Sequence, residues 1–127
     1  HGKLAKPDPS ALIMAYKQIS AHVLSQKSER VRLEEERMLS EWAGPETAKK
    51  VIAGLSKGDV FMISLNDPKV TLKLLVIPKN FLTTKEARKI SPHFRGFKII
   101  EEHQFEKLVR KNLGIINALQ GFISQKD

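Results

Sequence analysis

The sequence predicts a small α/β domain, with an α+β arrangement left open. We expect a mixed sheet of about three strands flanked by helices, and a long helix or helical hairpin at the N-terminus. Apolar residues recur at helical spacing through residues 10–42. Two β-prone runs follow at residues 60–65 and 70–77, and helix and strand patterns alternate after them. This order predicts strands that pair locally and helices that cover their faces.

Composition limits the alternatives. The chain has 127 residues, 41% hydrophobic and 28% charged, which is typical of one compact globular domain. It has no cysteine, which excludes disulfides, thiolate metal sites and cysteine nucleophiles. No apolar run approaches the ~20 residues that a membrane helix needs, and no signal-peptide pattern is visible. We therefore expect no membrane association and an intracellular location, either cytoplasmic or in the nucleus or nucleoid.

The N-terminal third divides into a lead-in and a helical region. Residues 1–9 carry two prolines and little apolar content, so we expect a flexible segment. Residues 10–44 form the helical region, with Ser10 as a candidate N-cap. One face carries apolar residues at spacings of four, three and four: Leu12, Tyr16, Ile19 and Val23. Whether residues 10–42 form one helix or two stays open.

Charges dominate the second half of this region. Arg30 and Glu34 are four residues apart, as are Arg32 and Glu36, which predicts two ion pairs on a solvated helix. Met38, Leu39 and Trp42 then restore an apolar face. Gly44 and Pro45 end the segment and begin the next helix.

Residues 45–127 are expected to form the α/β core. A helix from Pro45 has a buried stripe that includes Val51 and Leu55. A strand over residues 60–65, an Asn-Asp-Pro turn and a strand over residues 70–77 predict a hairpin. The second strand ends in a continuous apolar run, which is typical of a strand covered on both faces.

Helix and strand then alternate to the end of the chain. Thr83 or Thr84 is a candidate N-cap for a helix that ends at Ile90, before a Ser-Pro pair. A short strand is expected over residues 97–100 and a helix from residue 101 onwards. Gly114 is the expected interruption before an apolar C-terminal helix.

The positive charge of the chain is concentrated in one stretch. Residues 69–98 hold eight Lys or Arg residues and one acid, Glu86, which gives +7 of the net +8. Such a concentration favours a surface that meets an acidic partner, nucleic acid first among them. A solvated basic face without a partner is the alternative, because charge alone does not identify a partner.

We expect the part from residue 79 to residue 98, a basic helix and the loop after it, to contact the phosphates of DNA or RNA. Three of its basic residues share one face of the short helix, and the aromatic ring of Phe94, which we expect in the loop, could stack on unpaired bases. Phe81 and Phe97 are more typical of core residues. The helix start could add backbone N–H groups for a phosphate. The candidate nucleic-acid-binding residues are Lys79, Lys85, Arg88, Lys89, His93, Phe94, Arg95 and Lys98.

A second hypothesis is a protein-interaction module. The N-terminal helical region could bind a partner helix or a second copy of the chain as a homodimer. Tyr16, Met38 and Trp42 are residue types that anchor interfaces, although they serve a core equally well.

The sequence gives little support for any of the common catalytic motifs. A metal-dependent nuclease could use Asp59 with Asp67 and Lys69, in the manner of restriction-endonuclease-like cores, which also contain strand-helix units. Asp59 and Asp67 bracket one strand, however, at up to ~25 Å, so we interpret both as turn residues. The Walker, HExxH and Gly-x-Ser-x-Gly patterns are also missing. Binding is thus favoured over catalysis, with no cofactor and no metal.

Overall fold

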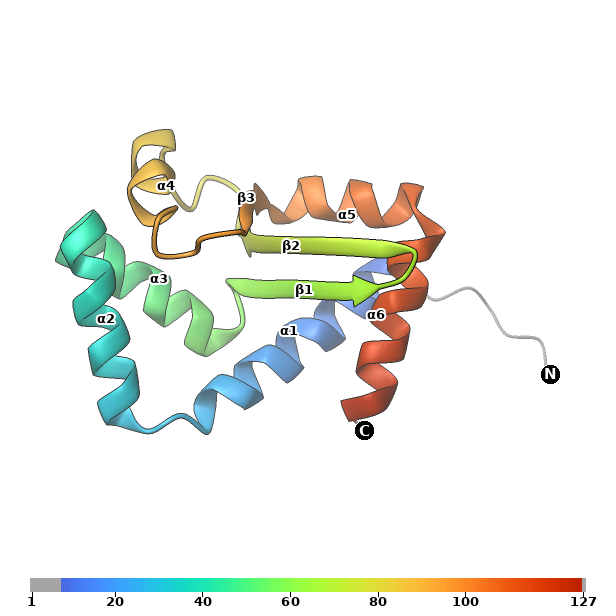
Figure 1. Ribbon diagram of the computed structural model, residues 1–127, viewed down its shortest axis with the longest axis horizontal. Helices are drawn as coiled ribbons and strands as arrows, with labels where there is room; N and C mark the ends of the chain where they lie inside the picture. Colours follow the sequence, from blue (N-terminus) through green and yellow to red (C-terminus); the bar gives the residue numbers. More distant parts are fainter. Residues whose placement is uncertain (1–7, 127) are drawn as a thin grey trace.

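The protein is a three-stranded mixed sheet with helices on both faces, so the predicted fold class is confirmed. The computed structural model describes residues 8–126, and the side chains of all these except Asp67, Phe122 and residues 124–126. Figure 1 shows the elements in chain order. They are α1 (Pro9–Ser25), α2 (Glu29–Ala43), α3 (Pro45–Lys57), β1 (Phe61–Asp67), β2 (Val70–Ile77), α4 (Thr84–Ile90), β3 (Lys98–Glu101), α5 (Glu102–Lys111) and α6 (Leu113–Lys126).

The strand β2 is the centre of the sheet. It pairs antiparallel with β1, with Phe61 opposite Val76, which confirms the predicted hairpin. It pairs parallel with β3, with Leu75 opposite Ile99. A parallel pair needs a crossover connection, and α4 lies within that connection. The sheet therefore presents α4 and its flanking loops beside the end of β2 (Figure 1).

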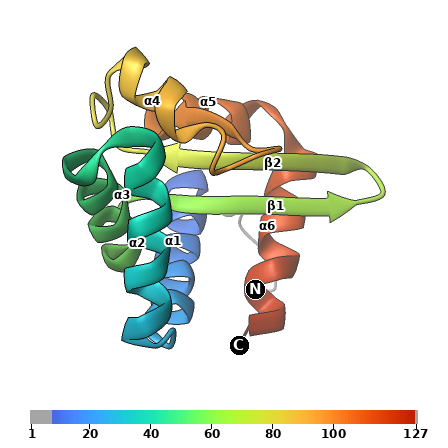
Figure 2. The same ribbon diagram turned by 60° about the vertical axis from the view of Figure 1, so that its left-hand side comes forward.

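The two faces of the sheet belong to two separate apolar clusters, because successive side chains of a strand alternate between faces. The first cluster holds Phe61, Leu74 and Val76 against α1, α5 and α6. The second holds Leu75 and Ile77 against residues of α2, α3 and α4. Figures 1 and 2 show α2 and α3 side by side at one end of the molecule and α6 at the other.

The N-terminal helical region is a pair of helices, which answers the question that the sequence left open. α1 ends at Ser25, and α2 begins after Ser28, whose Oγ accepts the N–H of Val31. α1 starts at Pro9, two residues before the start that Ser10 as N-cap predicts, because Asp8 is its N-cap. The predicted lead-in, apart from Asp8 and Pro9, lies outside the described residues.

The predicted ion pairs of α2 are wrong. Among the described residues, neither Arg30–Glu34 nor Arg32–Glu36 forms. Arg37 instead lies between two acids of its own helix and pairs with both Glu34 and Glu41. Spacing on a helix permits several competing pairs, and each contributes only ~0.3 kcal/mol, so sequence alone does not select among them.

The last helical segment divides two residues earlier than predicted. α5 ends at Lys111, and Asn112 separates it from α6 with extended backbone. The Oδ1 of Asn112 accepts the N–H of Gly114 at 2.9 Å, so Asn112 rather than Gly114 makes the break. Ile115, Ile116 and Leu119 of α6 are buried. In the part of the chain that the structure describes, no helix has the length and apolar character needed to cross a membrane.

Gly58 gives a test of the packing between α1 and α3. It ends α3 with a φ of +84°, and a Cβ there would lie 2.8 Å from the carbonyl oxygen of Lys17 in α1. Gly96 has a similar φ of +88° but open space around it. We predict that Gly96→Ala costs about 1–2 kcal/mol of unfolding free energy, from its backbone conformation alone. Gly58→Ala should cost at least about 1 kcal/mol more, because α1 must move. Urea unfolding measures both, and equal losses would contradict the close approach of α1.

Candidate functional site

The short helix α4 is held by a capping box at its N-terminus. The Oγ of Thr83 accepts the N–H of Glu86 at 3.1 Å, and the N–H of Thr83 donates to Glu86 Oε1 at 2.9 Å. Ile90 at the other end is fully buried in the second cluster. The backbone N–H groups of Thr83 and Glu86 therefore already donate hydrogen bonds within the protein. Fewer N–H groups at this helix start are left for a phosphate than the sequence predicted.

Glu86, the one acid of residues 69–98, is turned towards α3. Its Oε2 accepts a hydrogen bond at 2.9 Å from the hydroxyl of Thr47, which is buried. The hydrogen bond from the backbone of Thr83, followed by that from Thr47, holds the pKa of Glu86 below its ordinary value. Glu86 is thus an ionised anchor for α4, and both its oxygens are occupied by donors of the protein.

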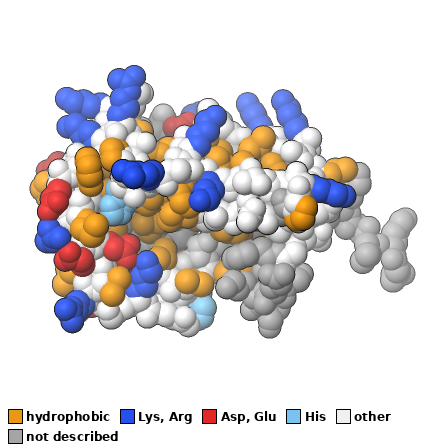
Figure 3. All heavy atoms as spheres, in the orientation of Figure 1, with side chains coloured by type: hydrophobic (Ala, Val, Ile, Leu, Met, Phe, Trp, Pro, Cys, Tyr) orange, Lys and Arg blue, Asp and Glu red, His pale blue; other side chains and the backbone are white. Residues whose placement is uncertain are grey.

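The opposite face of α4 carries three exposed cations, Lys85, Arg88 and Lys89. They lie three and four residues apart, so the helix places them together. None of the three belongs to an ion pair among the described residues. Figure 3 shows Lys and Arg side chains gathered over the position that α4 occupies in Figure 1. The structure therefore confirms the prediction that these three residues lie on one face of a short helix.

Two further predicted cations flank α4. Lys79 is exposed in the loop before the helix, where Asn80 has a φ of 60° and donates its N–H to Glu101 Oε2 at 2.9 Å. Arg95 is exposed in the loop of residues 91–97 after the helix. We call Lys79, Lys85, Arg88, Lys89 and Arg95 the α4 surface. The hydrogen bond from Asn80 fixes the first of its loops to the start of α5.

Lys98 lies apart from the α4 surface. It is opposite Leu74 in the sheet register, and Leu74 belongs to the first cluster. Its neighbour Phe97 packs on the second cluster, which includes Ile90 of α4. Because strand side chains alternate, Lys98 extends from the other face of the sheet. Lys98 is exposed, but it does not extend the face formed by α4.

Two lysines that the sequence analysis did not select stand over aromatic rings of this region. The Nζ of Lys50 on α3 is 4.9 Å from the centre of the Phe81 ring. The Nζ of Lys73 on β2 is 5.8 Å from the centre of the Phe97 ring. Such contacts contribute about 0.5–1 kcal/mol at exposed sites. Lys50 is 31 positions before Phe81 in the chain, and no local pattern could have connected them.

His93 and Phe94 turn inwards, which corrects the expectation of an accessible aromatic ring in this loop. Phe94 lies in the loop as predicted but is only 6% exposed, because it packs in the second cluster. His93 lies edge-on to it, with ring centres 4.9 Å apart. Both residues line a cavity instead of the α4 surface. Phe94 cannot stack on a base in this conformation.

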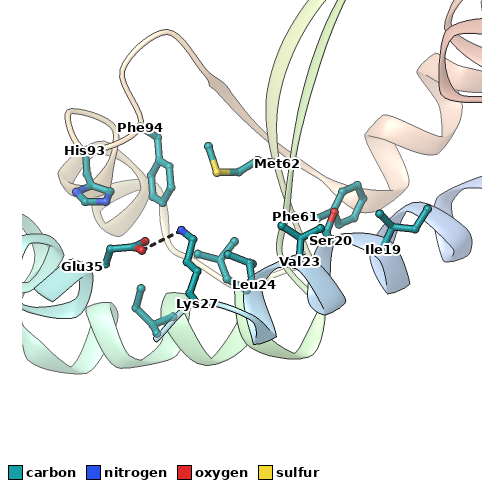
Figure 4. Close-up of a pocket in the computed structure, with 12 residues that line it drawn as sticks. Ile19, Ser20, Val23, Leu24, Lys27, Glu35, Phe61, Met62, His93 and Phe94 are labelled. Atoms are coloured by element: carbon teal, nitrogen blue, oxygen red, sulfur yellow. Dashed lines mark hydrogen bonds and ion pairs between the residues drawn. The ribbon is translucent and has the colours of Figure 1, made fainter. Parts of the chain in front are cut away.

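That cavity has a volume of about 250 Å³ and lies between α1, α2, α3, β1 and the loop of residues 91–97. Figure 4 shows its walls: Ile19, Val23 and Leu24 from α1, Phe61 and Met62 from β1, and the His93–Phe94 pair. The Nζ of Lys27 forms an ion pair at 2.9 Å with Glu35 of α2 at the same end as His93 (Figure 4). Figure 3 shows an apolar hollow on this face of the molecule.

The three candidate interface anchors are divided between core and surface. Tyr16 is 5% exposed in the first cluster, and its hydroxyl donates to the carbonyl oxygen of Met62 at 3.0 Å. Burial raises the pKa of Tyr16. Its prediction as an interface anchor is therefore wrong, and it is a core residue. Met38 and Trp42 are 43% and 54% exposed on α2, four residues apart.

The residues of the nuclease hypothesis occupy the two ends of β1. Asp59 precedes the strand, and Asp67 is its last residue, directly before the turn at residues 68–69. Asp59 therefore lies outside the strand, as expected of a turn residue, whereas Asp67 is a strand residue opposite Val70 and not a turn residue. Among the described residues, no three His, Cys, Asp or Glu side chains gather in a group that could hold a metal ion.

Comparisons with known proteins found no similar protein: no family model, no curated protein and no solved structure matches the chain.

The bond between Thr47 and Glu86 yields a test that depends on pH. A carboxylate with a lowered folded-state pKa stabilises the fold above its unfolded pKa, and this contribution is lost as pH falls through the folded pKa. Thr47→Val should therefore cost about 1–2 kcal/mol at pH 7. The cost should become smaller as the pH falls from 7 towards the lowered folded-state pKa of Glu86, because a carboxyl that takes up a proton accepts a weaker hydrogen bond.

Chemical denaturation across this pH range measures the difference. Thr71→Val, at an exposed site of β2, is the matched control and should change little throughout the range. A cost for Thr47→Val that stays the same across the whole range would exclude Glu86 as the charged partner.

Proposed function

We propose that this protein is a non-catalytic nucleic-acid-binding domain whose α4 surface contacts phosphates. The observation that carries the proposal is the set of five exposed cations without an acidic partner among the described residues, beside a single acid that is engaged with α3. Cations displayed in this way can each replace a counterion on a phosphate.

The contrast with the remaining ion pairs supports this choice. Lys17, Lys27, Arg37 and Arg110 each pair with a Glu at 3.1 Å or less. Arg30 of α2 and Lys111 of α5 are also exposed without an ion pair among the described residues, so unpaired cations are not confined to the α4 surface. The α4 surface differs in density: Lys85, Arg88 and Lys89 share one face of a seven-residue helix whose single acid is engaged with α3.

The aromatic residues favour backbone contact over the reading of bases. Phe94 is buried, and Phe81 and Phe97 are partly buried beneath Lys50 and Lys73. Stacking on unpaired bases needs an exposed ring face. We therefore propose binding that depends strongly on salt and weakly on sequence, as phosphate contacts do.

The triple variant Arg88→Ala/Lys89→Ala/Arg95→Ala tests the α4 surface. Affinity for a short DNA or RNA duplex should fall steeply with salt in the wild type. The slope of log K against log salt should decrease by up to about three in the variant, since three phosphate contacts are removed. Fluorescence anisotropy over a salt series gives both slopes.

The matched control is Arg30→Ala/Lys57→Ala/Lys111→Ala, which removes the same charge from exposed sites near the ends of α2, α3 and α5. This control should retain most of the slope. Absence of binding by the wild type, or equal losses in both triple variants, would refute a dedicated α4 surface.

A second candidate is self-association through α2, favoured by the exposure of its apolar residues. Val31, Met38 and Trp42 are exposed by 44%, 43% and 54%, and their spacing of seven and four places them on one face. Because the two copies in a twofold dimer use the same patch, such a stripe on one helix can face itself. The partner proposed here is a second copy of the chain.

Trp42→Ala tests this candidate. If α2 forms a dimer, light scattering of the wild type should show a mass that rises with concentration towards twice 14.4 kDa, and the variant should stay at the monomer mass. Leu113→Ala, at another exposed apolar residue, serves as the control and should associate like the wild type. A concentration-independent monomer mass for the wild type would exclude the candidate.

A further inference from the structure

The cavity between α1 and β1 is apolar along most of its length and charged at one end. Its long wall consists of Ile19, Val23 and Leu24 on one side and Phe61 and Met62 on the other (Figure 4). Lys27, Glu35 and His93 stand together at the opposite end (Figure 4). A site of this kind fits a molecule with an apolar body and one polar group.

The charged end continues into a narrow extension between α2 and α3. Lys27, Glu35 and Leu24 line both the cavity and this smaller space of about 10 Å³, so the two adjoin at these residues. Arg32 of α2 and Ser56 of α3 add a cation and a hydroxyl. The charged residues that line the cavity and the adjoining space are Lys27, Arg32 and Glu35. Glu29 and Glu36 lie on the outer side of Arg32.

Arg32 has a buried polar atom without a hydrogen-bond partner, which points to a ligand independently of the shape of the cavity. Its Nε is buried and has no hydrogen-bond partner, although almost all buried polar atoms have one. Arg32 also borders an outer hollow with Glu29 and Glu36, and yet it forms no ion pair with either of them. An unsatisfied buried donor of a guanidinium group calls for an acceptor, and carboxylates are the best match to its geometry.

We propose that this cavity binds a small apolar monocarboxylic acid, such as a medium-chain fatty acid. Its carboxylate lies at the end formed by Lys27 and Arg32, and its hydrocarbon chain lies along α1 and β1. The volume of about 250 Å³ is below the ~300–1,000 Å³ of sites for drug-sized ligands, which favours a short chain. This site is separate from the α4 surface and does not depend on nucleic-acid binding.

The charges argue against the other occupants. A cationic ligand would bring a third positive charge to Lys27 and Arg32 and would leave the Nε of Arg32 without an acceptor. A neutral apolar molecule would leave the Nε of Arg32 without its acceptor. A carboxylate would accept from this donor. It would also compete with Glu35 for the Nζ of Lys27, which lies 2.9 Å from the Oε1 of Glu35.

Titration with octanoate, octanol and octylammonium tests the head-group choice. We expect shifts in the NMR methyl signals of Val23 and Met62 that saturate at one octanoate per chain. Octanol should bind about tenfold more weakly, which corresponds to one charge-assisted hydrogen bond. Octylammonium should bind more weakly still. Equal affinity for all three probes, or a preference for octylammonium, would overturn the proposal.

Three variants at the charged end should change octanoate affinity in opposite directions. Lys27→Met and Arg32→Met should each weaken octanoate binding by about tenfold. Glu35→Gln should strengthen it, because the competing carboxylate is removed from Lys27. Octanol binding should change little in all three variants, which separates a lost charge contact from a damaged cavity.

Matched control residues lie on α1 and α2. Lys17 of α1 is paired at 3.1 Å with Glu102 and does not line the cavity, so Lys17→Met should bind octanoate like the wild type. Arg30 of α2 is exposed and also outside the cavity, so Arg30→Met should do the same. If octanoate affinity falls equally in the control and test variants, the effect comes from net charge and the proposed site is wrong. If Glu35→Gln does not raise octanoate affinity, the proposed site is also wrong.

Discussion

Burial of β2 on both faces is the constraint on which the rest of the structure depends. Leu74 and Val76 face the first cluster, Leu75 and Ile77 face the second, and all four are nearly inaccessible. A strand covered on both sides requires helices on both sides, and its parallel neighbour β3 requires a crossover between them. That crossover contains α4. The position of the basic residues is thus a consequence of the way in which the core is closed.

The seven-residue α4 would not be stable alone, since isolated helices shorter than ~12–15 residues are marginal in water. Three contacts replace the missing length: the capping box of Thr83 and Glu86, the bond from Thr47 and the burial of Ile90. The same contacts orient the helix. They turn Glu86 towards α3 and leave Lys85, Arg88 and Lys89 on the outer face.

The strand and hairpin pattern could be predicted from sequence because it is local. Val70–Ile77 was found without error, and α4 was found to within one residue, since turn residues and an N-cap mark both. The division of α1 from α2 depends on Ser28 as a cap within a charged segment, and the apolar period alone does not reveal it. Short-range signals therefore fix the elements but not all their ends.

The functional geometry was harder to predict because it depends on contacts between distant residues. Phe94 has the sequence surroundings of an exposed loop residue, and only its packing against residues of α3 and β2 explains its burial. Lys98 continues the run of basic residues in the sequence, but its register opposite Leu74 places it on the other face of the sheet. Arg32 has Glu36 in pairing position, yet its Nε is buried without a partner beside Ile52 and Ser56 of α3.

The α4 surface and the cavity are formed by neighbouring residues of one loop. His93 and Phe94 line the cavity, whereas Arg95, the next residue, is exposed to solvent. Gly96 has a φ of +88°, so the chain reverses here in a conformation that other residues rarely adopt. An occupant of the cavity would contact the wall that supports Arg95, and the two proposed sites therefore share a structural element without sharing a residue.

The like charges of the α4 surface cost stability, which is consistent with the proposal that this surface meets an anion. Lys85 and Arg88, and likewise Lys85 and Lys89, are like charges at three- and four-residue spacing, and each such pair destabilises a helix by about 0.2–0.5 kcal/mol. An acid on this face would relieve the repulsion, and Glu86 is on the same helix. The fold instead uses Glu86 to fix α4 to Thr47. In the proposed complex, phosphates would take the place of the missing acid and relieve the repulsion that remains.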